Sequence, residues 1–477
     1  MVVATIAEEP MSPAGRLFHT RGFNCFVIAV IGLSKEADVD VDLIKIGLQQ
    51  TLLKHPRFSS IVVGDDEKDG RRRWVRTTVN LENHVVVPSL DPDMDSPDEF
   101  VEDYISEMTR SSMDISIPLW ELHILKVKTS NANAIGVFKI HHSIGDGSSL
   151  MSLILACTRK TSDPDALPTI PKAKHSTSVS GNRTGLWRIL FFIWWGLVLL
   201  WNTWVQFVVF MLTILFLKDT DTPIKGRPGV ECNRKRIVYK SFNLDDVKLV
   251  KNATNATIND VILGMTQAGL SRYLNRKYSD ENVQSMEGRT ENNLPKNIRL
   301  RANVLVNVRQ SAGINDLANM MERNSKVKWG NQIAYVLIPL NISLQSDPLD
   351  HIRQAKSVID VKKHSLEAIA TYRVGKFLAD VFSIKRAADV MNRILLNTTM
   401  SFSNVVGPTE EISFYGHPLT FMAPTVCGHP HALTVHFQSY VDKMMLVVNV
   451  DETVIPDPHL LCDDILKSLE VMKQAVA

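Results

Sequence analysis

The sequence predicts an α/β protein whose two halves meet across a central cleft, with an apolar segment inserted between them. Three observations predict this class. Helical and strand-like patterns alternate both before and after the middle of the 477 residues, which favours two α/β layers. An uncharged run from Ile189 to Leu217 separates these two regions. Hydrophobic residues make up 45% and charged residues 22% of the chain, which is ordinary globular usage and excludes a disordered or fibrous protein.

The chain is expected to have three parts. Residues 1–168 form an N-terminal half and residues 236–477 a C-terminal half. Residues 169–235 form a linker that contains the hydrophobic segment at about 189–217. Length allows this division, since 477 residues exceed what a single hydrophobic core normally holds.

Apolar spacing in the N-terminal half predicts both helices and strands. We expect helices at Asp42–Leu53, Glu99–Met108 and Ser148–Arg159, and strands at Trp120–Lys128 and Ala134–His142.

The C-terminal half begins with a strand-like run, and its first helix has Thr257 or Asn259 in position to cap it. We expect strands at Arg236–Phe242, Val304–Val308, Ala334–Leu340 and Met444–Val450, and helices at Asn259–Leu274, within Ser346–Val390 (one or two) and at Pro456–Val476. The polar stretch Ser279–Lys296 is expected to be an exposed loop.

Several classes of function are disfavoured by composition. Lysine and arginine number 53 against 51 acidic residues, so no overall positive field is present to hold nucleic acid. The five cysteines lie far apart without a CxxC pair, which argues against a disulfide framework or a zinc knuckle. Neither HExxH nor an Asp-rich cluster occurs, so we expect no metal and no bound cofactor. The first ten residues lack the apolar core of a secretory signal.

The uncharged run is long enough to associate with a membrane. A helix over its 29 positions would extend about 43 Å, more than the ~30 Å of a hydrocarbon core. Only four polar residues interrupt it, and five of the eight tryptophans lie in or beside it. A buried core helix is the alternative, but soluble helices are rarely apolar on every side for this length.

Basic residues flank the run at both ends, so the lysine and arginine asymmetry that orients a membrane span is weak. A single tilted span and a re-entrant or interfacial helix both agree with these flanks.

The most informative string is Ile140-His141-His142-Ser143-Ile144-Gly145-Asp146-Gly147, between an expected strand and an expected helix. Strand alternation places His141 and His142 on opposite faces, which suits one catalytic and one structural imidazole better than a pair of metal ligands. A histidine can take and return a proton near neutral pH. The alternative is that His142 is a buried structural histidine beside an Asp-Gly turn, without a catalytic role.

Two roles are open for Asp146. It could orient a catalytic histidine, or it could fix the turn, for instance by pairing with an arginine; we favour the structural role. Gly145 and Gly147 are expected to permit backbone with positive φ at this turn.

The string matches HHxxxDG and resembles the signature of the acyl-CoA-dependent acyltransferase superfamily, which includes chloramphenicol acetyltransferase. Almost the whole chain resembles the plant form of the wax ester synthase/diacylglycerol acyltransferase family. The matching blocks are Met11–Phe18, Pro118-Leu119-Trp120, Asn259-Asp260, Asn307-Val308-Arg309, Ser403–Pro408 and Leu433–Asp451. The DFGWG element of the soluble plant HxxxD enzymes is absent.

This resemblance implies a two-domain, chloramphenicol acetyltransferase-like fold. It implies that His142 is the general base, with His141, Asp146 and Gly147 as supporting motif residues. Asn259, Ser403 and Asn404 become candidates for oxyanion or site support, although turn and cap roles suit them equally well. The residues that contact coenzyme A stay unassigned.

The implied reaction transfers a fatty acyl group from acyl-CoA, the co-substrate, to a long-chain alcohol, and also to diacylglycerol. Direct attack without an acyl-enzyme agrees with the absence of GxSxG from the sequence. Two alternatives stay open: another alcohol acceptor, and a non-catalytic lipid-binding membrane protein on the same scaffold.

A lipid membrane is the expected partner, and the endoplasmic reticulum, with the plasma membrane as a second location, is the expected site. A single span would put the two halves on opposite sides of the bilayer. Because they would share one catalytic cleft, we expect both halves to face the cytosol.

Overall fold

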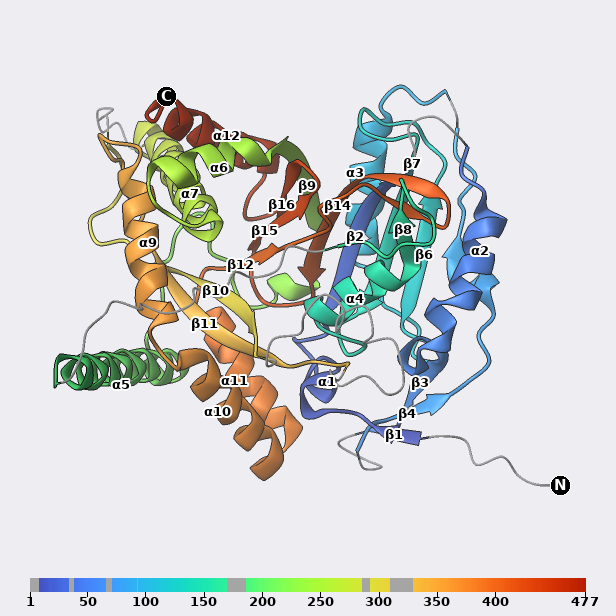
Figure 1. Cartoon of the computed structure of the whole chain (residues 1–477), viewed down its shortest axis with the longest axis horizontal. Coiled ribbons are helices and arrows are strands. Elements are labelled where there is room, and N and C mark those ends of the chain that lie inside the picture. Colours follow the sequence, from blue (N-terminus) through green and yellow to red (C-terminus); the bar gives the residue numbers. More distant parts are fainter. Residues whose placement is uncertain are drawn as a thin grey trace.

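The computed structural model describes residues 8–33, 38–65, 71–91, 93–169, 186–284, 292–308 and 329–477. In these ranges the chain forms two large sheets and a small one, surrounded by helices (Figure 1). Residues 170–185 of the expected linker 169–235, and Arg309, lie outside the described residues.

A seven-stranded sheet forms the core of the N-terminal half. Its strands, in spatial order, are β5 (Val85–Val86), β6 (Trp120–Leu125), β7 (Ala134–His141), β2 (Phe26–Leu33), β14 (His417–Cys427), β13 (Ile412–Phe414) and β8 (Thr158–Lys160). Two of these strands, β13 and β14, come from the C-terminal part of the chain. The two halves are therefore interleaved, because β14 pairs along β2 with Thr425 opposite Ile28.

A six-stranded mixed sheet forms the core of the C-terminal half. Its strands, in spatial order, are β11 (Ile333–Leu340), β10 (Leu300–Asn307), β12 (Met400–Val405), β15 (Leu433–Tyr440), β16 (Lys443–Asp451) and β9 (Lys235–Asn243). A small third sheet contains β1 (Glu8–Pro10), β4 (Arg73–Arg76) and β3 (Ser60–Val63). The expected two-layer α/β class is confirmed.

Helices cover both sheets (Figure 1). With the N-terminal half lie α2 (Val41–Gln50), α3 (Pro97–Met108) and α4 (Gly147–Cys157), whereas α1 (Pro13–Leu17) contacts α10 and α11. With the C-terminal half lie α6 (Leu244–Ala253), α7 (Ile258–Gln284), α9 (Asp350–Lys363), α10 (Glu367–Val381), α11 (Ile384–Leu396) and α12 (Pro458–Gln474). Apolar faces of α6, α7, α9 and α12 pack on the six-stranded sheet in one core.

Two details of the C-terminal half differ from the sequence expectation. The loop expected from Ser279 is wrong over its first part, because α7 continues to Gln284. Contacts with α12, such as the salt bridge of Lys277 with Asp457 at 3.0 Å, support the polar end of this helix. The region Ser346–Val390 contains α9 and α10 and the start of a third helix, α11, rather than one or two helices.

The cap of α7 is Thr257 rather than Asn259. The Thr257 hydroxyl accepts from the backbone N–H of Asp260 at 3.3 Å, and the Asp260 carboxylate accepts from the backbone N–H of Thr257 at 2.7 Å. This reciprocal pair is a capping box with Asp in place of the usual Glu.

The apolar run forms one 30-residue helix, α5 (Leu186–Leu215). It extends from the body at the lower left of Figure 1. Its stretch Ile189–Leu215 has a mean hydropathy of 1.9, and only 11% of its most apolar window is buried. The alternative of a buried core helix is therefore wrong, and length and composition make α5 a candidate membrane span.

Every polar residue that interrupts the apolar run is hydrogen-bonded to the C-terminal half. Three of these residues contact the α9–α10 connection and one contacts β10. The partners are His364 O for Asn202 (3.1 Å), Leu366 N for Thr203 (2.9 Å), Lys362 Nζ for Gln206 (2.5 Å) and Arg301 Nη1 for Thr213. The second half of α5 is thus fixed to the body, packed against α10 and α11.

Candidate active site

The HHxxxDG string forms the turn between β7 and α4. Because β7 pairs with β2, His141 lies opposite Phe26. One residue further, the backbone N–H of His142 donates to Cys25 O at 2.9 Å. The ladder between the two strands therefore fixes the His142 backbone, and its side chain is 4% exposed.

The His141 ring is held on both nitrogens. Its Nε2 donates to Asn24 Oδ1 at 2.9 Å and its Nδ1 accepts from Ser143 Oγ at 2.7 Å. The ring also stacks on His19, with centroids 4.2 Å apart. Burial lowers the pKa of His141 well below its usual value, so the ring is neutral. This arrangement stabilises the turn and leaves neither ring nitrogen open to a substrate.

The His142 ring has a different environment. It stacks on Phe18 with centroids 4.4 Å apart, and its Nδ1 is buried with no hydrogen-bond partner among the described residues. Burial is the main cause that lowers the pKa of His142, and the nearby side chains of Asp146 and Asn331 oppose that shift. A lowered pKa keeps the imidazole neutral near pH 7, which is the form that accepts a proton.

Asp146 connects the turn to two other segments. It is the N-cap of α4, where its carboxylate accepts from the backbone N–H of Ser149 at 3.0 Å. The same carboxylate accepts from the backbone N–H of Gln332 at 2.9 Å. These bonds hold the turn, the helix and the start of β11 together.

The two glycines of the turn do not have positive φ, so that expectation is wrong. Gly145 is needed for space instead: a Cβ there would lie 2.7 Å from the Cβ of Ser149 and 3.2 Å from the Trp329 ring. Gly147 is exposed at the start of α4, with open space around it.

The segment Trp329–Gln332 covers this turn and was missed in the sequence. Trp329 Nε1 donates to Ile144 O at 2.6 Å, and Asn331 Nδ2 donates to His142 O at 2.9 Å. The Asn331 Oδ1 atom is buried without a partner among the described residues. The string Trp-Gly-Asn-Gln matches none of the family blocks noted above, and only its composition, a tryptophan beside an amide, offered a signal.

The other candidates lie on β12 and α7. Asn404 Nδ2 donates to Asn259 Oδ1 at 2.7 Å, so the structure brings these two residues together. Ser403 precedes Asn404 on β12 and is half-buried. Within the described ranges, no hydrogen bond or ring contact joins any of the three to the His142 ring.

The motif helix α4 nevertheless lies against the ends of β10 and β12. Val405, next to Asn404, packs in one cluster with Met151 and Leu155 of α4. Asn307 at the end of β10 donates from Nδ2 to Ser148 Oγ, at the start of α4, at 2.7 Å. The C-terminal ends of β10 and β12 thus converge on the helix that follows His142.

Metal ligation is not indicated. Among the residues that the structure describes, no group of three His, Cys, Asp or Glu side chains is placed to hold a metal ion. All five cysteines are free thiols.

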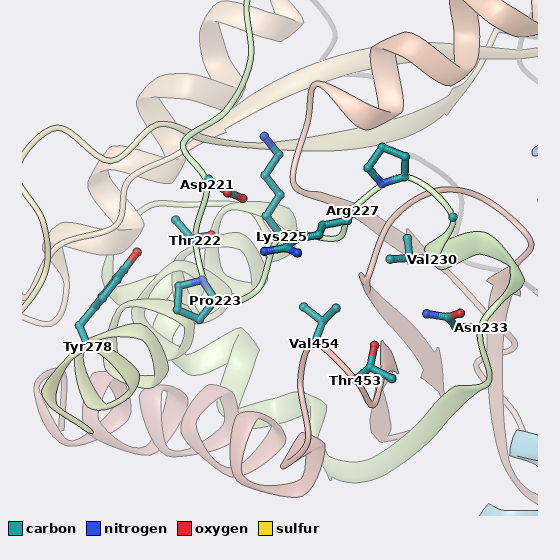
Figure 2. A pocket seen from close by; sticks show the side chains of 12 residues that line it. Asp221, Thr222, Pro223, Lys225, Arg227, Val230, Asn233, Tyr278, Thr453 and Val454 are labelled. Atoms are coloured by element: carbon teal, nitrogen blue, oxygen red, sulfur yellow. The ribbon is translucent and has the colours of Figure 1, made fainter. Parts of the chain in front are cut away.

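A cavity of about 870 Å³ lies in the C-terminal half (Figure 2). Its wall includes Lys225, Arg227, Asn233, Tyr278 and Thr453. None of the predicted site residues lines it.

Residues 24–262 match the wax ester synthase/diacylglycerol acyltransferase catalytic domain, and residues 329–473 match the WS/DGAT C-terminal domain. Wax ester synthase/diacylglycerol acyltransferase 11 of Arabidopsis thaliana is 50% identical over 99% of this chain and 96% of its own length. Wax ester synthase/diacylglycerol acyltransferase 5 of the same plant is 49% identical over 98% of this chain and 94% of its own length.

Solved structures support the fold. The wax ester synthase/diacylglycerol acyltransferase from Marinobacter aquaeolei VT8 superposes with a TM-score of 0.61 at 17% identity, covering 98% of this chain and 99% of that one. The first condensation domain of the CDA synthetase gives a TM-score of 0.57 at 12% identity, covering 99% and 97%. The expected two-domain acyltransferase fold is confirmed, and the chain belongs to the wax ester synthase/diacylglycerol acyltransferase family.

Proposed function

We propose that this acyltransferase joins the fatty acyl group of acyl-CoA to a long-chain alcohol, with diacylglycerol as a second acceptor and His142 as the general base. The observation that carries the proposal is a buried imidazole that follows β7 in an intact HHxxxDG turn. Family membership supplies the acyltransferase activity; the acceptor and the role of His142 are our proposal.

In the proposed reaction His142 removes the proton of the acceptor hydroxyl as its oxygen attacks the thioester carbonyl. The new C–O bond gives a tetrahedral intermediate with a negatively charged oxygen. Collapse of this intermediate breaks the C–S bond, and the imidazolium returns its proton to the coenzyme A thiolate. The products are an ester and free coenzyme A, and no acyl-enzyme, metal or resident cofactor is needed.

The negatively charged oxygen needs hydrogen-bond donors. We assign this task to Ser403 and Asn404, because the end of β12 packs against α4 through Val405. Asn259 would position Asn404 through their 2.7 Å hydrogen bond. His141 would keep the turn rigid, and Asp146 with Gly147 would start the helix that supports it.

Lipid products test the acceptor and the base together. The chain and its His142→Ala variant are expressed in a host that lacks neutral-lipid synthesis, and wax esters and triacylglycerols are measured. Wax ester from the wild type and none from the variant supports the proposal. Equal product from both, or transfer only to small aromatic alcohols when the purified enzyme is offered them beside hexadecanol, contradicts it.

The apolar helix α5 supports membrane association. Its outward side chains are large and exposed, among them Trp194 at 65% and Trp201 at 67%. Lipid would cover this surface where the long-chain substrates are concentrated. We therefore propose that α5 holds the enzyme at the endoplasmic reticulum membrane.

The contacts of α5 favour partial insertion over a full span. From Asn202 onward its polar residues are bonded to the body, so the stretch without such bonds is Leu186–Trp201. At 1.5 Å per residue this part is about 24 Å long, less than the ~30 Å hydrocarbon core. We propose that both halves stay cytosolic; Asn252 and Asn255, two exposed glycosylation sequons, would then carry no glycan, and endoglycosidase-sensitive glycans on either would contradict it.

A further inference from the structure

A second apolar surface lies on α10, outside the active site. It consists of Ile369, Phe377, Val381 and the following Phe382, whose exposed fractions run from 43% to 59%. Ile369, Phe377 and Val381 lie on one side of the helix at multiples of four residues, and the exposed Arg373 occupies the remaining position of this series. The Phe377 and Phe382 rings contact each other edge to face at 6.4 Å. We call these four residues the α10 apolar surface.

This surface belongs to a helix that lies alongside α5. The backbone N–H of Leu366, just before α10, donates to Thr203 Oγ1 of α5 at 2.9 Å. Further along, Val374 of α10 packs in the same cluster as Phe210 of α5. The later residue of α10 lies near the later residue of α5, so the two helices run in the same direction. Both helices lie at the lower edge of the molecule in Figure 1.

The opposite side of α10 is fixed to the sheet. Thr371 donates to Tyr335 O of β11 at 2.9 Å, and Glu367 accepts from the backbone N–H of Leu337 at 3.2 Å. A buried salt bridge of 2.8 Å joins Glu367 to Lys362, which also bonds to α5. Because α5, α10 and β11 are connected in this way, α10 cannot turn its apolar surface inward.

Exposed basic residues lie within and next to the α10 apolar surface in the sequence. Arg373 and Lys376 lie on α10 itself, and Lys385 and Arg386 begin α11. The exposed acidic residues of the same two helices are Asp380 and Asp389, so positive charge is in excess. Exposed aromatic side chains bordered by lysine and arginine fit the headgroup region of a bilayer that contains anionic lipid.

We propose that the α10 apolar surface is a second membrane contact, which places Phe377 and Phe382 in the headgroup boundary of an anionic bilayer, toward the end of α5 that is fixed to the body. The inference rests on the proposed membrane function of α5. Together the two contacts hold the C-terminal half in one orientation, with the six-stranded sheet above the membrane.

Depth-sensitive fluorescence tests this contact in the full chain. The exposed Cys232 is first replaced by serine, since the other cysteines are buried. An environment-sensitive fluorophore is then attached at Phe377→Cys, at Trp194→Cys on α5, or at Leu249→Cys, an exposed apolar position on α6 that serves as the control. The probes are vesicles of phosphatidylcholine with phosphatidylserine, carrying a spin label on the acyl chain.

Quenching of the Phe377 and Trp194 positions, without quenching at Leu249, is the expected result. Quenching at Trp194 alone overturns the α10 contact and leaves the membrane role of α5 intact. No quenching at either position overturns both proposals. A change at Phe377 that needs no vesicles and follows self-association in sedimentation would assign the surface to a second copy of the chain, and it would also overturn the proposal.

Charge reversal provides the second arm. Arg373→Glu with Lys376→Glu should weaken quenching at Phe377 by about tenfold or more on anionic vesicles, because each basic residue near such a surface favours binding about fivefold. Phosphatidylcholine vesicles should show no such difference. The matched control is Lys248→Glu with Lys467→Glu, both exposed on α6 and α12, which should change nothing. Equal loss in control and test variants would contradict an anionic contact at α10.

Discussion

Two adjacent histidines in this protein have different physical states. His141 is used on both ring nitrogens, whereas His142 is held through its backbone and keeps a buried Nδ1 without a partner among the described residues. The sequence predicted one structural and one catalytic imidazole from strand alternation alone. It could not predict that Asn24 and His19 complete the His141 site, because those residues come from a distant segment.

Asn331 is a positioning residue for the proposed base. Its amide holds the His142 carbonyl at 2.9 Å, and its side chain opposes the lowering of the His142 pKa. We expect Asn331→Ala to lower kcat more than it changes the KM for the alcohol, because the backbone that carries the ring loses a hydrogen bond at the His142 carbonyl. The pH profile of kcat/KM should also change: its acidic limb should move to lower pH, since a group that raises the pKa has been removed.

The alternative to a positioning role is that Asn331 only stabilises the fold. A residue that only supports the fold would lower the amount of active enzyme and leave the pH profile in place. An unshifted acidic limb in Asn331→Ala, with stability equal to that of the wild type, would contradict the positioning role.

At the level of elements, periodicity predicted most helices and strands but not their partners. The string from Ala134 predicted β7 almost to the residue. The pairing of β14 with β2 could not be predicted, since it joins segments about 390 residues apart through backbone bonds. The polar side chains at the end of α7 predict a loop, whereas the contact with Asp457 before α12 that stabilises the helix is not local in sequence.

The N-cap of α4 gives a prediction at this scale. Asp146→Ala removes the acceptor for both Ser149 N–H and Gln332 N–H, and loss of an N-cap alone costs about 0.5–2 kcal/mol. Asp146→Asn keeps one carbonyl oxygen and should be less destabilising. Urea unfolding of both variants in detergent checks this order.

Equal stability of the Asp146 variants would contradict the structural role of the carboxylate. If Asp146→Asn and Asp146→Ala were equally stable and equal to the wild type, the carboxylate would not be holding the turn. A loss of activity without a loss of stability would instead favour the orienting role that the sequence left open for Asp146.

For the whole molecule, the interleaving of the two halves is the main feature that sequence analysis did not foresee. Their surfaces are also joined by salt bridges, for example Arg234 with Asp103 at 3.0 Å and Arg236 with Glu102 at 3.4 Å. The family resemblance, and not periodicity, implied the two-domain, chloramphenicol acetyltransferase-like fold, because such non-local pairings have no signature in periodicity. The same holds for Trp329–Gln332, whose role depends on where β11 begins.

Buried neutral histidines give the molecule a predicted pH dependence. Burial lowers their pKa values in the folded state, to about 3 for His19, His55 and His431 and about 4 for His436. The unfolded chain takes up protons as the pH falls through about 6.5, whereas the folded chain does not. The contribution of these histidines to the free energy of unfolding should therefore be complete above pH 6.5. The free energy of unfolding should decrease as the pH falls below 6.5.

Denaturant midpoints at three pH values check the sign. The midpoint should be nearly equal at pH 8.5 and 7.5, where these histidines are neutral in both states, and clearly lower at pH 5.5. A midpoint at pH 5.5 that equals or exceeds the one at pH 7.5 would contradict this interpretation.

The most direct test of the central claim is the kinetics of purified His142→Ala beside its thermal stability. The account predicts that acyl transfer from acyl-CoA to hexadecanol falls by about 10²–10⁴-fold, while the Tm stays close to that of the wild type because the backbone bond of residue 142 to Cys25 remains. Transfer at the wild-type rate by a folded His142→Ala enzyme would contradict it.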